Sequence, residues 1–189
     1  MAKRVFFSFH YQDVTDFRAN VVRNHKTTKY EGAGYFDASI WESSKKEGDA
    51  SLKRLINGEI QNTSVTVVLI GSETFSRPWV RYEIFKSLAK GNKILGIHIN
   101  SIKGRDSRIK SLGANPFEYL AIEFSADGKK IFLKEFVNGK WVNYDKLDGW
   151  SVYNTNQVDC GKIYKLSKYY KVYDWVSNNG YINFDKWIE

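Results

Sequence analysis

The segment Val65-Thr66-Val67-Val68-Leu69-Ile70 consists almost entirely of apolar and β-branched residues. A run of this kind is typical of a strand that is covered on both faces, as in a parallel sheet with helices on either side. We place this strand at residues 64–70, and three further apolar runs of strand length lie at residues 4–9, 35–40 and 93–99. The sequence therefore predicts four buried strands.

The segments between these runs carry apolar residues at helical spacing. The first follows Asp13, which can cap a helix, and the second follows residues 49–51. The third begins at Pro78, whose fixed φ suits a first helical turn, and ends before Gly91. The apolar residues concerned are Val14, Phe17, Val21 and Val22, then Leu52, Leu55, Ile56 and Ile60, and last Val80, Ile84, Phe85 and Leu88.

Alternating strands and helices predict right-handed crossovers and an α/β fold with a parallel sheet flanked by helices. We expect a flavodoxin-like strand order, 2-1-3-4-5. Ligands of such sheets bind beyond the carboxyl ends of the strands, where the strand order reverses. The candidate site is therefore built from the residues just after Phe9, those just after Ile70, and the helix that begins at Pro78.

The pattern changes after residue 118. Residues 119–144 indicate an antiparallel meander, because Asp127-Gly128 and Asn138-Gly139 are both strong hairpin signals. A helix is expected over 161–179 with Gly180 as its stop, followed by a short final helix over 181–188.

The length of 189 residues suits one domain with its own core. We expect residues 1–118 to form the α/β core, and residues 119–189 to form a meander and an aromatic C-terminal helix packed on the same domain.

The net charge of +8 raises the question of a nucleic-acid partner, but the Lys and Arg residues are scattered, which argues against one. A positive field also attracts a small anion such as a dinucleotide.

Cysteine usage and hydropathy exclude several classes of protein. Cys160 is the single cysteine, and no Cys/His cluster has zinc spacing, so we expect neither an internal disulfide nor a metal. The first residues lack the apolar stretch of a signal peptide, and no segment approaches the roughly 18 apolar residues that a membrane-spanning helix needs. These features predict a cytoplasmic protein without a membrane partner.

Three segments in register carry a resemblance to a known family. Val5-Phe6-Phe7-Ser8-Phe9-His10 resembles the first box of Toll/interleukin-1-receptor (TIR) domains, and the segment from Val67 to Ser76 resembles their third strand with its serine-rich exit. Trp79-Val80-Arg81-Tyr82-Glu83 resembles the Trp-x-x-x-Glu signature of enzymatic TIR domains. The order and spacing of the three segments are specific.

Three sequence segments point to one subgroup of this family. Lys3 to Tyr11, Val21-Val22-Arg23-Asn24 and Phe36-Asp37-Ala38-Ser39-Ile40-Trp41 resemble the TIR-like ThsB proteins of the bacterial Thoeris antiviral defence system. The resemblance implies that NAD is the substrate and that no cofactor is needed. It also implies release of nicotinamide, formation of a cyclic ADP-ribose isomer, activation of a partner NAD-degrading effector by this messenger, and a phage component as the trigger.

One carboxylate suffices for this chemistry. Nicotinamide in NAD is a cationic pyridinium that leaves as a neutral molecule, so it needs no general acid. Positive charge develops on the ribose in the transition state, and a nearby carboxylate stabilises it. The resemblance assigns this role to Glu83, which shares a helix face with Trp79. The alternative interpretation is that Glu83 is an exposed helix residue that pairs with Lys86.

The substrate-binding candidates are Phe9, His10, Asp37, Ser39, Trp41, Trp79 and Tyr82. Phe9 and His10 could stack on a base, although core packing explains Phe9 equally well. Asp37 could bind ribose hydroxyls, or it could be an alternating polar position of a strand. Tyr82 could touch the substrate, although an exposed helix tyrosine is the ordinary expectation.

Two other functions compete with NAD cleavage. One is a non-catalytic TIR-like interaction module that recruits a defence effector. The other is a basic, nucleic-acid-binding flavodoxin-like domain, against which the scattered lysines argue.

Overall fold

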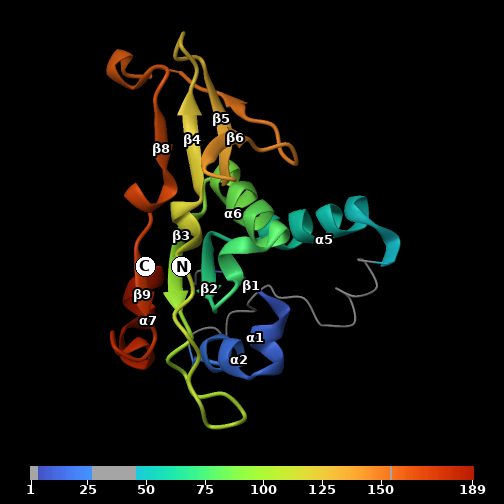
Figure 1. Cartoon of the computed structure of the whole chain (residues 1–189), viewed down its shortest axis with the longest axis vertical. Helices are drawn as coiled ribbons and strands as arrows, with labels where there is room; N and C mark the ends of the chain where they lie inside the picture. Colours follow the sequence, from blue (N-terminus) through green and yellow to red (C-terminus); the bar gives the residue numbers. More distant parts are fainter. Residues whose placement is uncertain (1–3, 27–45, 154) are drawn as a thin grey trace.

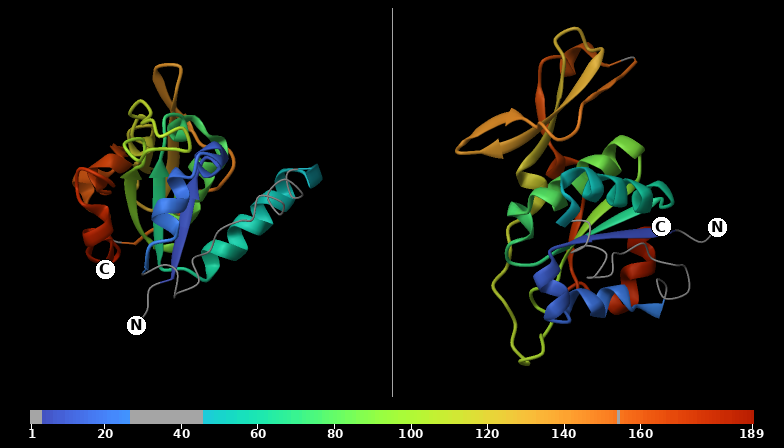
Figure 2. Two further views of the ribbon diagram at one scale, coloured as in Figure 1. Left: turned by 90° about the horizontal axis from the view of Figure 1, so that it is seen from below. Right: turned by 90° about the vertical axis from the view of Figure 1, so that its right-hand side faces the viewer.

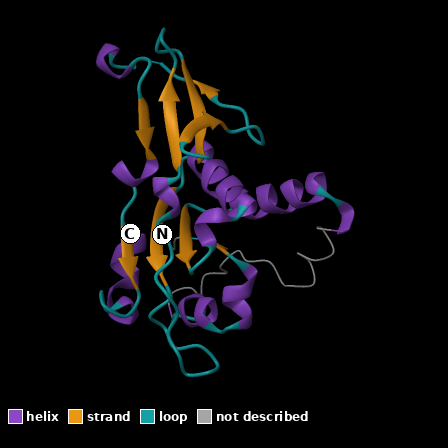
Figure 3. Ribbon diagram, viewed as in Figure 1, coloured by secondary structure: helices purple, strands orange, loops and turns teal. Residues whose placement is uncertain are grey.

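The computed structural model describes residues 4–26, 46–153 and 155–189, and these form two sheets (Figure 1). The first sheet is parallel, with the order β1-β2-β3-β9. Its strands are β1 (Val5–Phe9), β2 (Val65–Ile70), β3 (Lys93–His98) and β9 (Val172–Asp174). The second sheet is antiparallel and extends from one end of the first (Figure 3).

The antiparallel sheet has the order β6-β5-β4-β8, and β7 pairs with β5. Its strands are β4 (Leu120–Phe124), β5 (Lys130–Val137), β6 (Lys140–Asn143), β7 (Trp150–Ser151) and β8 (Ile163–Lys165). The predicted meander is confirmed. At the β5–β6 turn, Asn138 and Gly139 have φ values of 49° and 80°, the positive pair that a tight hairpin requires.

The predicted α/β class with a helix-flanked parallel sheet is confirmed. The strands expected at 4–9, 64–70 and 93–99 are β1, β2 and β3, and they lie side by side in that order. The strand expected at 35–40 lies outside the described residues. In the described part of the chain, the strand beside β3, at the place of the fifth strand of the expected order, is β9, which follows the meander in sequence.

The second and third predicted helices are confirmed as α5 (Asp49–Gln61) and α6 (Pro78–Lys90), and α6 ends at Gly91 in the left-handed conformation. The first predicted helix needs a correction. The expected first helix is divided into α1 (Tyr11–Thr15) and α2 (Arg18–Arg23). Phe17 between them has a φ of 68°, which no α-helix can contain.

The helices cover both faces of the parallel sheet, as the right-hand view of Figure 2 shows. On one face, α2 and α7 (Gly180–Ile188) pack against Phe7 and Leu69. On the other face, α5, α6 and the near end of the antiparallel sheet pack against Phe6 and Val68. Side chains alternate along a strand, so successive residues of β1 enter different cores.

The helix expected over 161–179 is wrong. This segment forms β8, the short 3-10 helix η4 (Leu166–Lys168) and β9. Its aromatic residues serve two different cores, because Tyr170 packs on the α6 side and Tyr173 stacks on Trp187 at 4.2 Å. The pairing of β8 with β4 and of β9 with β3 therefore outweighed the local preference for a helix that the apolar spacing indicated.

The short final helix is confirmed as α7, although it begins at Gly180, the residue expected to end the preceding helix. Both β9 and α7 contact the parallel sheet, while residues 120–165 supply the antiparallel sheet. The domain division at residue 118 stays a prediction. No helix in the described part of the chain is long and apolar enough to cross a membrane.

Candidate functional site

Glu83 belongs to α6, and its side chain faces β1. Its side chain is 4% exposed, and the Ser8 hydroxyl donates a hydrogen bond of 2.6 Å to Glu83 Oε2. Ser8 is also buried and points to the α6 side of the sheet, whereas its neighbours Phe7 and Phe9 point to the other side. The interpretation of Glu83 as an exposed helix residue is therefore wrong.

Burial controls the protonation of Glu83. Removal from water raises the pKa of the Glu83 carboxyl group to about 8, while the hydrogen bond from Ser8 acts in the opposite direction. The group therefore carries a proton for most of the time at neutral pH in this conformation. A cation placed beside this carboxyl group would favour its charged form.

His10 follows β1 at the carboxyl edge of the parallel sheet, as predicted. The ring is half-buried, and burial followed by the charges of Arg77 and Lys110 lowers its pKa. A neutral imidazole is therefore present at neutral pH, and it can stack on a base or accept a proton. The two cations that surround it belong to the N-terminus of α6 and to the connection after β3.

Asp13, the plausible helix cap that follows the first TIR-like segment, is a second carboxylate at this edge. It is 3% exposed, and burial raises its pKa to about 6. The carboxylate lies directly against Gly71 at the exit of β2, where a Cβ atom would stand 2.3 Å from Asp13 Oδ1. The pair Asp13 and Gly71 therefore brings the exits of β1 and β2 together.

The connection after β3 folds back over the same edge. Arg18, which is 1% exposed, donates from Nε to the carbonyl of Ile102 at 2.9 Å and from Nη2 to the carbonyl of Arg108 at 2.6 Å. Farther along, a Cβ on Gly113 would stand 1.8 Å from the carbonyl oxygen of Gly71, so this connection touches the exit of β2. Arg18 is a structural anchor for a wall of the site.

Phe9 is not brought to Glu83. It packs at the edge of the core formed with α2 and α7, and the Arg23 guanidinium lies 5.1 Å from the centre of its ring. Core packing accounts for this position, as the alternative interpretation held. Contact between Phe9 and a substrate stays a prediction.

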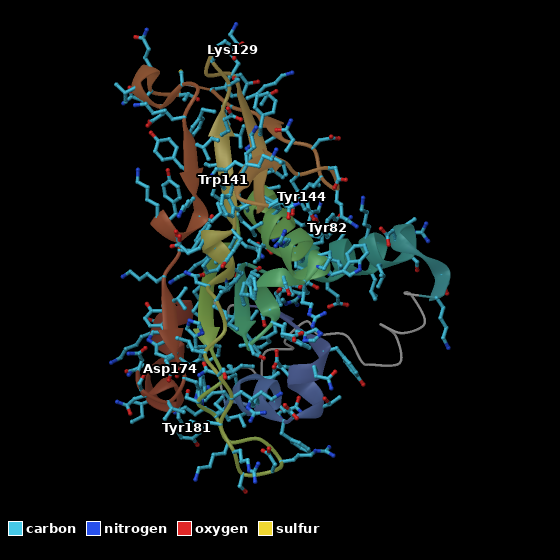
Figure 4. The ribbon with its side chains drawn as sticks, viewed as in Figure 1. Tyr82, Lys129, Trp141, Tyr144, Asp174 and Tyr181 are labelled. Atoms are coloured by element: carbon cyan, nitrogen blue, oxygen red, sulfur yellow. The ribbon has the colours of Figure 1, made fainter. Side chains whose placement is uncertain are left out.

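Trp79 and Tyr82 pack toward α5 and the antiparallel sheet. Tyr82 is 2% exposed and its hydroxyl donates to Asn57 Oδ1 at 3.1 Å, so it is not an exposed helix tyrosine. Trp79 meets Tyr82 edge to face at 5.8 Å, and Lys146 Nζ lies 5.1 Å from the centre of the Trp79 ring. Figure 4 shows Tyr82 near Tyr144, where α6 meets the antiparallel sheet. Their predicted contact with substrate is untested.

The remaining candidates, Asp37, Ser39 and Trp41, lie outside the described residues. Over the described parts of the chain, no three His, Cys, Asp or Glu side chains are grouped to hold a metal ion. Among the described residues, the candidate site therefore consists of Glu83 with Ser8, and of the edge formed by His10 and Asp13.

Comparison with known proteins identifies the family. The family model described as Thoeris protein ThsB, TIR-like domain, matches residues 6–103. The chain is also 58% identical to a Bacillus cereus (strain MSX-D12) protein named "Putative cyclic ADP-D-ribose synthase ThsB1". The alignment is 194 positions long and covers 100% of both chains. The chain therefore belongs to the TIR-like ThsB family of the Thoeris defence system.

Proposed function

We propose that this chain is an NAD-cleaving enzyme that releases nicotinamide and makes a cyclic ADP-ribose isomer in anti-phage defence. The name of the Bacillus cereus relative, a cyclic ADP-D-ribose synthase, supports this activity. The observation that carries the proposal is the buried Glu83, held by the Ser8 hydroxyl beside the carboxyl end of β1.

The proposed reaction has two steps at the anomeric carbon of the nicotinamide ribose. First, the carbon–nitrogen bond breaks, and its electron pair leaves with nicotinamide, which departs neutral. Glu83 stabilises the positive charge that develops on the ribose. Second, an oxygen or nitrogen of the same molecule forms a new bond to the anomeric carbon, which closes the ring, and the proton that the attacking group loses passes to the solvent. Exclusion of water by a closed edge favours this second step over hydrolysis.

The family context supports the remaining parts of the proposal. The chain acts in the cytoplasm, where a phage component triggers it, and its cyclic product activates a partner effector that degrades NAD. The messenger is the link between the two proteins, so this function needs no stable complex between them.

The test is to incubate the purified chain with NAD, with and without lysate from phage-infected cells, and to follow the products by mass spectrometry. We expect nicotinamide and a cyclic product in equal amounts from the triggered protein. Glu83→Gln should lower both by at least about 100-fold, because it removes the charge that stabilises the transition state.

Glu59→Gln on α5 is the matched control and should keep the activity of the unmodified chain. If no trigger yields product, and defence in cells survives Glu83→Gln, the chain is a non-catalytic interaction module instead.

A further inference from the structure

Buried polar atoms without a hydrogen-bond partner gather at the carboxyl edge of the parallel sheet. Four of the atoms of this kind found among the described residues lie here: Asp13 Oδ2, Arg77 Nε, His98 Nδ1 and Asn100 Oδ1. These residues follow β1, precede α6, end β3 and follow β3, respectively. Folded proteins satisfy nearly all such atoms, so a cluster of exceptions at one edge indicates a place where another molecule supplies the partners.

Asp13 is held at this edge by its backbone and by close packing. Its backbone N–H donates to the carbonyl of His10 at 2.9 Å, which fixes it one turn beyond β1. Its two carboxylate oxygens lie where a Cβ of residue 71 would otherwise stand, 2.3 and 2.4 Å away. Only a glycine at the exit of β2 allows this approach. The carboxylate is therefore built into the junction of β1 and β2.

The neighbouring cations leave Asp13 Oδ2 without a hydrogen-bond partner. Lys110 and Arg18 both pair with Asp16, and Arg77 pairs with Glu73. Burial outweighs the attraction of these cations and raises the pKa of Asp13. A buried acceptor of this kind destabilises the protein until a donor reaches it.

We propose that Asp13 is a substrate-binding residue whose carboxylate accepts a hydrogen bond from a ribose hydroxyl of NAD. This inference rests on the proposed function. The anionic pyrophosphate is excluded as the partner of a carboxylate, whereas ribose hydroxyls are donors that carboxylates bind at the carboxyl ends of parallel strands in other dinucleotide sites. Arg77 and Lys110, which act electrostatically on both His10 and Asp13, supply positive charge for the pyrophosphate.

The experiment measures NAD binding without turnover. Isothermal titration calorimetry with NAD would compare Glu83→Gln with the double variants that add Asp13→Asn, Asp13→Ala or Asp106→Asn. Asp106 is an exposed aspartate of the connection after β3 and serves as the charge-matched control. We expect Asp13→Asn and Asp13→Ala to weaken binding by about tenfold or more, and Asp106→Asn to change it by less than about twofold.

Thermal unfolding of the same variants separates binding from structure. Removal of a buried, unpartnered carboxylate should leave the melting temperature of Asp13→Asn equal to that of its parent or higher. Unchanged NAD affinity in the Asp13 variants would overturn this inference alone. A lower melting temperature or failure to fold in both Asp13 variants would also overturn it, because Asp13 would then be structural. If Glu83→Gln binds no NAD and the triggered wild-type chain releases no nicotinamide, the proposed function itself fails.

Discussion

Ser8 and Glu83 stand 75 positions apart in the chain, yet the Ser8 hydroxyl donates to Glu83 Oε2 across 2.6 Å. The contact joins the first strand of the sheet to the helix that carries the candidate catalytic carboxylate. Because both side chains are buried, this hydrogen bond is formed in a medium of low polarity, where it acts strongly on the orientation and the charge of Glu83. Ser8 is thus a positioning residue for the proposed reaction.

Ser8→Ala should move the pH profile of nicotinamide release toward higher pH. The hydrogen bond from Ser8 lowers the pKa of Glu83, so its loss leaves burial unopposed and raises that pKa further. The reaction needs the charged form, and we expect the acid side of the profile to shift upward by about one pH unit. The measurement is the initial rate of nicotinamide release at a saturating concentration of NAD, between about pH 6 and about pH 9.

Ser8→Thr is the control, since it keeps the hydroxyl group and should restore the original profile. A profile that is lower at every pH but unshifted would mean that Ser8 contributes only to packing.

The free energy of unfolding should fall as pH rises through the weakly acidic and neutral range. Unfolded Glu83 releases its proton near pH 4.5, but the folded pKa is about 8, so the folded state binds more protons between these values. Asp13, whose pKa rises from 3.8 to about 6, acts in the same direction at lower pH. Urea unfolding at pH 5 and pH 8 measures the difference.

Glu83→Gln should remove most of that pH dependence and raise the free energy of unfolding at pH 8. The expected gain is on the order of 4 kcal/mol, since the pKa rises from 4.5 to about 8 on folding and each pKa unit corresponds to about 1.4 kcal/mol. Equal pH dependence in the variant and the unmodified chain would show that Glu83 is solvated in the folded protein.

Gly71→Ala should damage the site and the fold together. The added Cβ would stand 2.3 Å from Asp13 Oδ1, so the carboxylate or the backbone must move. We expect a loss of about 1 to 3 kcal/mol in the free energy of unfolding, as for other overpacked positions, and weaker NAD binding. Denaturant unfolding and calorimetry measure the two effects.

Gly58→Ala on α5 is the matched control for that substitution. No atom lies within 4 Å of its added Cβ, and alanine is favoured over glycine in a helix, so the variant should gain up to about 1 kcal/mol. Comparable losses in both variants would contradict the proposed close approach of Asp13 to residue 71.

Arg18→Ala should release the connection after β3 from the edge of the site. The variant leaves the carbonyls of Ile102 and Arg108 without their side-chain donor and opens space at Gly104, which lies against the guanidinium. We expect a loss of about 3 kcal/mol or more in the free energy of unfolding. Hydrogen exchange should accelerate at residues 102–110 and remain unchanged in the antiparallel sheet. Uniform acceleration in both sheets would contradict a local anchoring role.

The strands and helices of the core were predictable because their signals are local. The apolar run of β2, the Pro78 start and Gly91 end of α6, and the Asn138-Gly139 turn each depend on residues that are adjacent in sequence. The same is true of the motif that singled out Glu83. In contrast, the segment 161–179 has helical spacing but forms two strands, because the edges of β4 and β3 offered hydrogen bonds that outweighed its local preference.

The sequence by itself determined the α/β class, the family motifs and the identity of the candidate carboxylate, since periodicity and motif spacing are properties of neighbouring residues. Tertiary structure alone decided that Glu83 is buried against Ser8, that Phe9 faces the opposite core, and that Asp13 lies over Gly71. Those relationships depend on how β1, β2 and α6 pack together. Burial and a distant hydrogen-bond partner, which no local pattern encodes, set the charge state on which the proposed chemistry depends.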